Sequence, residues 1–322
     1  MVDMTTRLGS LDLPNPVLTA SGCAAAGREL GQFFDVAELG AVVTKSIMLN
    51  PRSGRPTPRM AETPSGMLNS IGLQGPGIAA FIDNDLAWLA EQGARTVVSI
   101  AGSNTDEFVT VARRLSGHPA VSMIEVNISC PNVESRGQVF ACDVQASSRV
   151  IGAVRRAVDP RIPIFAKLTP DVTDIGAIAR ACADSGVDGF SLINTVLGLV
   201  IDTDTFGPFL GGVTGGLSGP AIRPIAVRCV WQVRQAVPHL PILGMGGIQS
   251  GLDALQFILA GASAVSVGTA VFGDPHAPVR ILAELEGALG ERGFASLREA
   301  IGLAHQPADQ RPRRRPADVA TS

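Results

Sequence analysis

The chain has no tyrosine, and aromatic residues make up only 4% of its 322 residues. This scarcity argues against a binding face built from aromatic side chains. Only two of the 26 basic residues are lysines, Lys45 and Lys167, and the formal net charge is −3. A balance so close to neutral gives no reason to expect a nucleic acid or an anionic membrane as partner. The 36 glycines instead suit tight turns between strands and helices.

Cysteine is also sparse and scattered. No pair of the five cysteines has the C-x-x-C spacing of a zinc or iron–sulfur site, and their odd number does not suggest a disulfide framework. No apolar run reaches the ~18 residues that a membrane-spanning helix needs, and the first residues lack the apolar core of a signal peptide. We therefore expect a soluble cytoplasmic protein without a metal site. The cysteines are Cys23, Cys130, Cys142, Cys182 and Cys229.

Short apolar segments alternate with longer helical patterns, which is typical of βα units on a parallel sheet. Eight such segments predict an α/β fold, a (β/α)8 TIM barrel. An open doubly wound sheet is the alternative, but no Gly-x-Gly-x-x-Gly sequence follows the first strand. The predicted strands span residues 17–20, 41–45, 96–100, 121–127, 162–168, 189–193, 242–244 and 264–267. The predicted helices span residues 104–115, 146–157, 174–184, 220–236, 251–260 and 279–292.

The barrel is predicted to form one domain over residues 1–305, with a distinct segment at each end. Residues 8–15 predict a short hairpin that closes the bottom of the barrel. Residues 306–322 are poor in apolar residues and include a basic run from Arg311 to Pro316, which predicts a disordered tail. A basic tail can contact RNA or an acidic partner, but a solvated tail is the simpler interpretation.

The strongest chemical pattern is the run from Asn127 to Asn132, directly after the fourth predicted strand. It places two carboxamides around Cys130. Carboxamides offer both donors and an acceptor, so two of them can bind the edge of a planar imide. The thiol can serve as proton acceptor or nucleophile if its pKa is lowered from about 8.5, or if it meets an acidic C–H. A capped strand end with a buried cysteine is the alternative for any one of these residues, and their clustering favours a site.

Glycines follow the last two predicted strands, as Gly246-Gly247 and Gly268-Thr269. The loops after strands seven and eight of a barrel recurrently bind phosphate, because the backbone N–H groups there can approach an anion. The alternative is that each glycine serves only a turn, but the repetition on adjacent strands favours a phosphate site. A third loop, residues 215–220, opens another helix and can complete it.

The two lysines also fall at strand ends. A lysine on a barrel strand is costly to bury without an anionic partner, and a ring system that becomes negatively charged would supply one. Lys167 is therefore expected to face the electron-accepting end of a flavin. Snorkelling to solvent is the alternative, and it is weaker because every other basic residue is arginine.

With these residues in place, the sequence resembles the class 1 dihydroorotate dehydrogenases, FMN-dependent barrel enzymes of pyrimidine biosynthesis. The resemblance covers about residues 7–300. The run from Asn127 to Asn132 is its most specific part, and cysteine at position 130 matches the soluble class 1 enzymes. The other matching segments are residues 15–22, 44–46, 69–74, 167, 194–195, 246–247 and 268–269.

The resemblance implies that (S)-dihydroorotate is oxidised to orotate. Cys130 would be the general base that takes the C5 proton while a hydride passes from C6 to flavin N5. Residues near 131–142 resemble a mobile loop that covers the site and excludes water. The implied substrate-binding residues are Lys45, Asn69, Ser70, Ile71, Gly72, Leu73, Asn127, Asn132, Asn194 and Thr195. The implied FMN-binding residues are Ser21, Lys45, Ser46, Asn127, Lys167, Ile193, Gly219, Gly246, Gly247, Gly268 and Thr269.

Residues 71–74 and 132–134 resemble the 1B enzymes, which reduce NAD. The resemblance then implies a homodimer, or a heterotetramer with a separately encoded subunit that carries FAD and a [2Fe–2S] cluster. This chain has no cysteine set for such a cluster. One departure is Ser99, where the family usually has an asparagine that contacts the flavin.

Two other functions are compatible with the same residues. A dihydropyrimidine dehydrogenase would use a similar motif to reduce uracil or thymine. A non-catalytic barrel that binds FMN or a phosphate metabolite is the second alternative, and the intact Cys130 between two asparagines argues against it.

Overall fold

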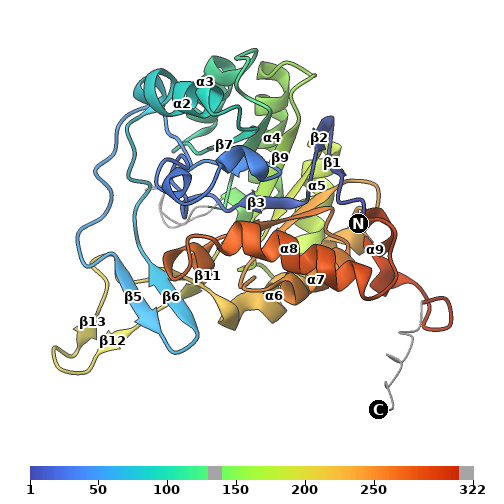
Figure 1. Ribbon diagram of the computed structural model, residues 1–322. Coiled ribbons are helices and arrows are strands. Elements are labelled where there is room, and N and C mark those ends of the chain that lie inside the picture. Colours follow the sequence, from blue (N-terminus) through green and yellow to red (C-terminus); the bar gives the residue numbers. More distant parts are fainter. Residues whose placement is uncertain (130–139, 312–322) are drawn as a thin grey trace.

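The computed structural model describes residues 1–129 and 140–311 and shows a parallel β-barrel surrounded by helices (Figure 1). Its strands are β3 (Val17–Thr19), β4 (Val42–Val43), β7 (Thr96–Ile100), β8 (Met123–Asn127), β9 (Ile164–Leu168), β10 (Gly189–Leu192), β15 (Ile242–Met245) and β16 (Ala264–Val267). They pair in the order β3-β16-β15-β10-β9-β8-β7-β4. Gly40 N donates to Val17 O over 2.9 Å and Leu18 bridges Ala41, so β3 and β4 close the sheet. The predicted TIM barrel is confirmed.

Six long helices cover the outside of the barrel, each packed against the next along the chain. They are α3 (Thr105–Leu115), α4 (Val144–Ala157), α5 (Ile175–Asp184), α6 (Arg223–Ala236), α7 (Gly251–Ala260) and α8 (Ala277–Gly290). Side chains of Asn104, Asp143, Asp174 and Ser250 cap four of them by accepting a backbone N–H. No helix in residues 1–129 and 140–311 is long and apolar enough to cross a membrane.

Shorter helical turns complete the connections between barrel strands and also occur after the last strand, β16. Between β3 and β4 the chain forms η1 (Leu30–Gln32) and η2 (Val36–Glu38) in place of a full helix. A continuous helical segment before β7 consists of α1 (Ile78–Ala80), η3 (Phe81–Leu86) and α2 (Ala87–Glu91). The remaining turns are η4 (Phe140–Cys142), η5 (Pro220–Ile222), η6 (Thr269–Phe272), α9 (Leu297–Ala300) and η7 (Leu303–His305).

An N-terminal hairpin closes one end of the barrel as predicted, but it spans residues 6–13 rather than 8–15. Strands β1 (Thr6–Leu8) and β2 (Leu11–Leu13) pair in antiparallel fashion. Leu8 and Leu13 are buried against residues of the barrel interior, including Val43 and Phe165. The opposite end of the barrel, where the parallel strands terminate, is therefore the end left for a ligand.

A second sheet, which the sequence did not predict, lies across that opposite end. It has the order β11-β14-β6-β5 and is formed by β5 (Met60–Thr63), β6 (Gly66–Asn69), β11 (Val196–Gly198) and β14 (Gly215–Ser218). A further hairpin, β12 (Ile201–Asp202) with β13 (Gly207–Pro208), extends beyond it at the lower left of Figure 1. The prediction of a loop over residues 215–220 was wrong for 215–218, because these residues pair with β6 and β11.

The end of the chain is described only to residue 311. Arg311 donates hydrogen bonds to the carbonyl oxygens of Gln306 (2.8 Å) and Ala304 (3.0 Å). The rest of the predicted tail, residues 312–322, lies outside the described residues, so its predicted disorder stays a prediction.

Candidate active site

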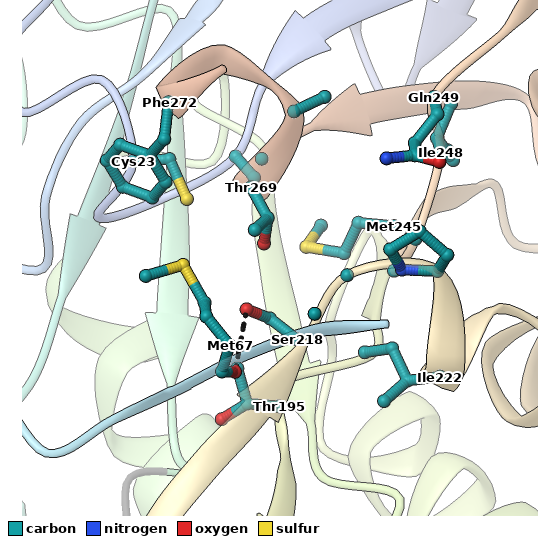
Figure 2. A pocket seen from close by; sticks show the side chains of 18 of the residues that line it. Cys23, Met67, Thr195, Ser218, Ile222, Met245, Ile248, Gln249, Thr269 and Phe272 are labelled. Atoms are coloured by element: carbon teal, nitrogen blue, oxygen red, sulfur yellow. Dashed lines mark hydrogen bonds between the residues drawn. The ribbon is translucent and has the colours of Figure 1, made fainter. Parts of the chain in front are cut away.

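A cavity of about 600 Å³ opens at the carboxyl ends of the barrel strands, beneath the second sheet. Its volume lies within the range of small-molecule and cofactor sites. Figure 2 shows Met67 and Ser218, from the second sheet, pointing toward Cys23 and Thr269, from loops of the barrel. Ten of the predicted site residues line it: Ser21, Lys167, Ile193, Asn194, Thr195, Gly219, Gly246, Gly247, Gly268 and Thr269.

The glycines of this cavity occupy positions that exclude a side chain. Gly219, Gly246 and Gly247 have φ values of +94°, +129° and +74°, which L side chains rarely adopt. A Cβ on Gly247 would also lie 2.6 Å from the carbonyl oxygen of Gly219. The loops after β14 and β15 therefore approach each other as bare backbone, beside the start of η6, and form a cradle suited to an anionic group.

We expect Gly247→Ala to reduce flavin content and stability together, because the new methyl group would separate the loops at residues 219 and 247. Gly287→Ala is the matched control, since Gly287 lies within α8 and a Cβ there meets no atom within 4 Å. Alanine at this helical position should stabilise the chain by about 0.5–1 kcal/mol. Bound flavin per chain and urea unfolding are measured for both variants, and equal flavin content would refute the cradle.

Lys167 is buried at the floor of the cavity and pairs with Glu125. The ammonium lies 3.6 Å from Glu125 Oε1, and the two side chains are 6% and 0% exposed. Glu125 stands two residues before Asn127 on β8, so both side chains point into the barrel. The predicted anion opposite Lys167 was a bound ring, whereas the structure supplies a carboxylate of the chain itself, that of Glu125.

A run of hydrogen bonds connects this ion pair to two of the predicted substrate-binding amides. Ser99 donates to Glu125 Oε1 over 2.9 Å, and its hydroxyl lies 2.9 Å from that of Ser46. Asn127 donates from Nδ2 to Ser46 Oγ over 2.9 Å. Five buried side chains, from strands β7, β8 and β9 and from the loop after β4, thus form one polar cluster: Ser46, Ser99, Glu125, Asn127 and Lys167. Lys45 precedes Ser46 in the sequence and lies at the edge of this cluster.

The same run continues to the end of β10. Ser129 donates from Oγ to Asn127 Oδ1 over 3.0 Å, and Asn194 donates from Nδ2 to Ser129 Oγ over 2.9 Å. Asn194 Oδ1 in turn accepts the backbone N–H of Thr195 over 2.8 Å. The structure therefore brings together Ser46, Asn127, Lys167, Asn194 and Thr195 as the sequence predicted.

Lys45 lies beside the loop that carries Cys23. A Cβ built on Gly22 would lie 3.4 Å from Lys45 Nζ, which places the ammonium beside that glycine. Burial raises the pKa of the Cys23 thiol, while the positive charges of Lys167 and Lys45 act in the opposite direction. Both predicted lysines thus direct positive charge at the same wall of the cavity.

None of the cysteines in residues 1–129 and 140–311 has the depressed pKa of an activated thiol. Burial raises the pKa of Cys23, Cys142 and Cys229, and raises that of Cys182 to about 12. The negative charge of Asp171 adds to the effect at Cys142. A thiol with a raised pKa is a poor source of thiolate at neutral pH.

The predicted segment from Asn69 to Leu73 divides between two places. Asn69 donates to Gly216 O over 3.2 Å, and a Cβ on Gly216 would lie against Thr195 Oγ1, so Asn69 and Thr195 approach the same glycine. The residues after it leave the second sheet: Ile71 O accepts the N–H of Arg55, and Leu73 is buried against Met48 and Ala101. The predicted site residues that the structure describes but that do not line the cavity are Lys45, Ser46, Asn69, Ser70, Ile71, Gly72, Leu73 and Asn127.

Cys130 and Asn132 lie outside the described residues, as does most of the loop predicted over residues 131–142. Their predicted roles stay predictions. The strand that leads to them ends at Asn127, and the described chain resumes at Phe140 in η4. Ala141 N donates to Ile128 O over 3.0 Å, so both ends of this interval meet at the carboxyl end of β8.

The family model for dihydroorotate dehydrogenase matches residues 3–289 of this sequence. The chain belongs to the dihydroorotate dehydrogenase family. The matched region contains the whole barrel and the second sheet, and therefore every residue of the cavity.

Curated relatives match over nearly their whole length. The catalytic subunit of dihydroorotate dehydrogenase B (NAD(+)) from Pelobacter propionicus is 50% identical over 300 residues, which cover 93% of this chain and 98% of the relative. The subunit of the same name from Desulforudis audaxviator is 48% identical over 305 residues, which cover 95% of this chain and 98% of the relative. The subunit from Anoxybacillus flavithermus is 47% identical over 299 residues, which cover 93% of this chain and 95% of the relative.

Proposed function

We propose that this chain oxidises (S)-dihydroorotate to orotate in pyrimidine biosynthesis, as the FMN-containing catalytic subunit of an NAD-linked enzyme. The family match supports the reaction. One observation carries the assignment to this cavity: three kinds of group occur together at one end of the barrel. They are the glycine cradle, the lysines Lys45 and Lys167, and the hydrogen-bonded amides of Asn127 and Asn194. We expect the barrel over residues 1–305 to act as one cytoplasmic domain.

The residues at the cavity fit FMN. The phosphate belongs at the cradle of Gly219, Gly246, Gly247, Gly268 and Thr269, where a side chain at 247 would collide with Gly219 O. Ser21, Ser46, Ile193 and Lys167 then hold the ring, with Lys45 and Asn127 at its edge. When bound, the flavin supplies the acceptor for the hydride that leaves substrate C6.

The substrate has a carboxylate and an imide edge, and the polar groups beside the cavity suit both. Asn127 and Asn194, joined through Ser129, present amides in fixed orientation, and Asn69 approaches from the second sheet. We assign them, with Lys45, Asn132 and Thr195, to the substrate. Ser70, Ile71, Gly72 and Leu73 support Asn69 from the loop that follows it.

Cys130 is proposed as the general base. Oxidation of dihydroorotate removes a hydride from C6 and a proton from C5, and a C5–C6 double bond forms. A thiolate at residue 130, three positions after the substrate-binding Asn127 in the sequence, takes that proton. The raised pKa values of the four described cysteines leave none of them suited to this role.

A second subunit is part of the proposal. The relatives are named as catalytic subunits of an NAD(+) enzyme, which supports a partner that passes electrons onward. The sequence of this chain has no cysteine set for an iron–sulfur cluster. We propose a homodimer of this chain that binds an FAD- and [2Fe–2S]-containing subunit to form a heterotetramer.

A substrate panel tests the proposed function against its alternatives. The chain is purified, its flavin is identified after heat release, and anaerobic flavin bleaching is followed with dihydroorotate or dihydrouracil. We expect FMN and rapid bleaching by dihydroorotate alone. Bleaching by dihydrouracil instead would favour a dihydropyrimidine dehydrogenase, and a colourless chain would overturn both enzyme assignments.

A further inference from the structure

The hydrogen bonds from Glu125 to Asn194 form one continuous run, and the donor and acceptor at each step can be assigned from the carboxylate of Glu125. A serine hydroxyl carries a single hydrogen, and an ionised carboxylate only accepts. Ser99 must use its hydrogen on Glu125 Oε1, so at the 2.9 Å contact between the hydroxyls Ser46 must be the donor. Ser46 Oγ is then an acceptor for every other neighbour. It takes the Nδ2 hydrogen of Asn127 and, at 3.4 Å, the hydroxyl hydrogen of Ser21.

This polarity passes through Asn127 to Asn194. With Nδ2 of Asn127 on Ser46, Oδ1 must face Ser129 and accept its hydroxyl hydrogen. Ser129 then has only lone pairs left, so Asn194 must approach it with Nδ2, which leaves Asn194 Oδ1 for the N–H of Thr195. The orientation of an amide is ordinarily ambiguous between its oxygen and nitrogen. Here the carboxylate of Glu125 at one end of the run and the backbone N–H of Thr195 at the other end require the same orientation of both amides.

We propose, resting on the proposed function, that Glu125 is a positioning residue. Through Ser99 it sets the direction of the Ser46 hydroxyl. With the backbone N–H of Thr195 at the far end, it holds Asn127 and Asn194 in the orientation in which they meet dihydroorotate. Its charge is held by the buried ammonium of Lys167, 3.6 Å from the oxygen that Ser99 binds. Ser99 is completely buried, and its hydroxyl contacts two other members of the run, Glu125 and Ser46, so it acts as a connector between them.

The hydrogen bonds of Ser99 can be removed by a substitution that leaves the ion pair of Lys167 and Glu125 unchanged. Ser99→Ala removes the hydrogen bonds that join Glu125 to Ser46 in the described part of the chain. The Ser46 hydroxyl is then free to turn, and the orientation of Asn127 is held only from the side of Ser129. Ser191→Ala is the matched control, because Ser191 is equally buried on a barrel strand and its hydroxyl has no hydrogen-bond partner in the described part of the chain.

The test measures orotate binding by perturbation of the flavin spectrum, together with the flavin reduction potential, in the flavin-loaded protein. We expect Ser99→Ala to raise the Kd of orotate about tenfold, the effect of losing one net hydrogen bond. The potential should stay unchanged, because Lys167 and Glu125 remain paired. Ser99→Thr, which keeps the hydroxyl, should restore the Kd. Glu125→Gln should raise the Kd and also shift the potential.

The outcomes separate this inference from the function on which it rests. Failure of the wild-type protein to bind orotate would overturn the proposed function and this inference with it. Normal orotate binding by the wild type, with Ser99→Ala indistinguishable from Ser191→Ala, would overturn the positioning role alone. Equal unfolding midpoints of the two alanine variants ensure that a changed Kd is not a loss of folded protein.

Discussion

Replacing Cys130 with alanine is expected to slow flavin reduction by dihydroorotate by about 10²- to 10⁴-fold, the usual contribution of a general base. Flavin content and orotate affinity should remain near those of the wild type, because the proposed binding groups are the glycine cradle and the amides, which this variant leaves unchanged. Stopped-flow absorbance under anaerobic conditions measures the rate, and equilibrium titration measures the two affinities.

Cys130→Ser provides the chemical control for that result. A hydroxyl is a weaker base than a thiolate, so this variant should also be slow at neutral pH and recover part of its rate as the pH rises. Cys229→Ala, at a cysteine of α6 that does not line the cavity and whose pKa burial raises, should reduce flavin at the wild-type rate. A near-normal rate for Cys130→Ala at neutral pH would contradict the assignment of the base.

Lys167→Met should destabilise the chain by about 3–5 kcal/mol and also weaken flavin binding. The ion pair with Glu125 is almost wholly buried, and removal of one partner leaves the other charge uncompensated in the barrel. Glu125 Oε2 has no hydrogen bond from the described residues, so no neighbour there can replace the ammonium. Urea unfolding of the flavin-free variant measures the stability, and bound flavin per chain measures the second effect.

The double variant Lys167→Met with Glu125→Gln separates stability from function. Because it removes both charges, it should regain most of the lost stability while flavin binding stays weak. Arg280→Met is a control for the loss of an ion pair, since its partners on the surface are half-exposed and such pairs contribute about 0–1 kcal/mol. A double variant as unstable as the single one would show that burial of Glu125 is not the cause.

The barrel could be predicted from the sequence because its strands are buried on both faces. Such strands appear as short runs of aliphatic residues that end at polar residues, and β7 and β16 have the predicted bounds. The helices carry local signals as well: Asn104 and Asp174 cap α3 and α5 at the predicted starts, and α7 has the predicted bounds. Strand ends in turn indicated where the site residues would gather.

The second sheet was missed because little in its sequence distinguishes it from loops. Strand β14 contains Gly215 and Gly216, and β5 begins at the exposed Met60, so neither shows a periodic apolar pattern. These segments are strands because they pair with one another over the cavity, an interaction between residues nearly 150 positions apart in the chain. Pairing of this kind is decided by tertiary context rather than by local propensity.

Glu125 is different, since a usable signal was present. It is a charged residue within a run of apolar ones and stands two positions before Asn127, so a strand places both on the same face. A carboxylate in that position requires a buried partner. The sequence has only two lysines, one of which, Lys167, stands beside Asn127 in the register of β8 and β9.

The most direct test of the account is an anaerobic single turnover in which dihydroorotate is added in excess to the purified protein. Flavin absorbance and orotate are measured together. We predict that one orotate forms for each flavin reduced, and that the yield falls with the flavin content of Gly247→Ala. Bound flavin that dihydroorotate does not reduce, or flavin reduction that yields no orotate, would contradict the assignment of this cavity to dihydroorotate oxidation.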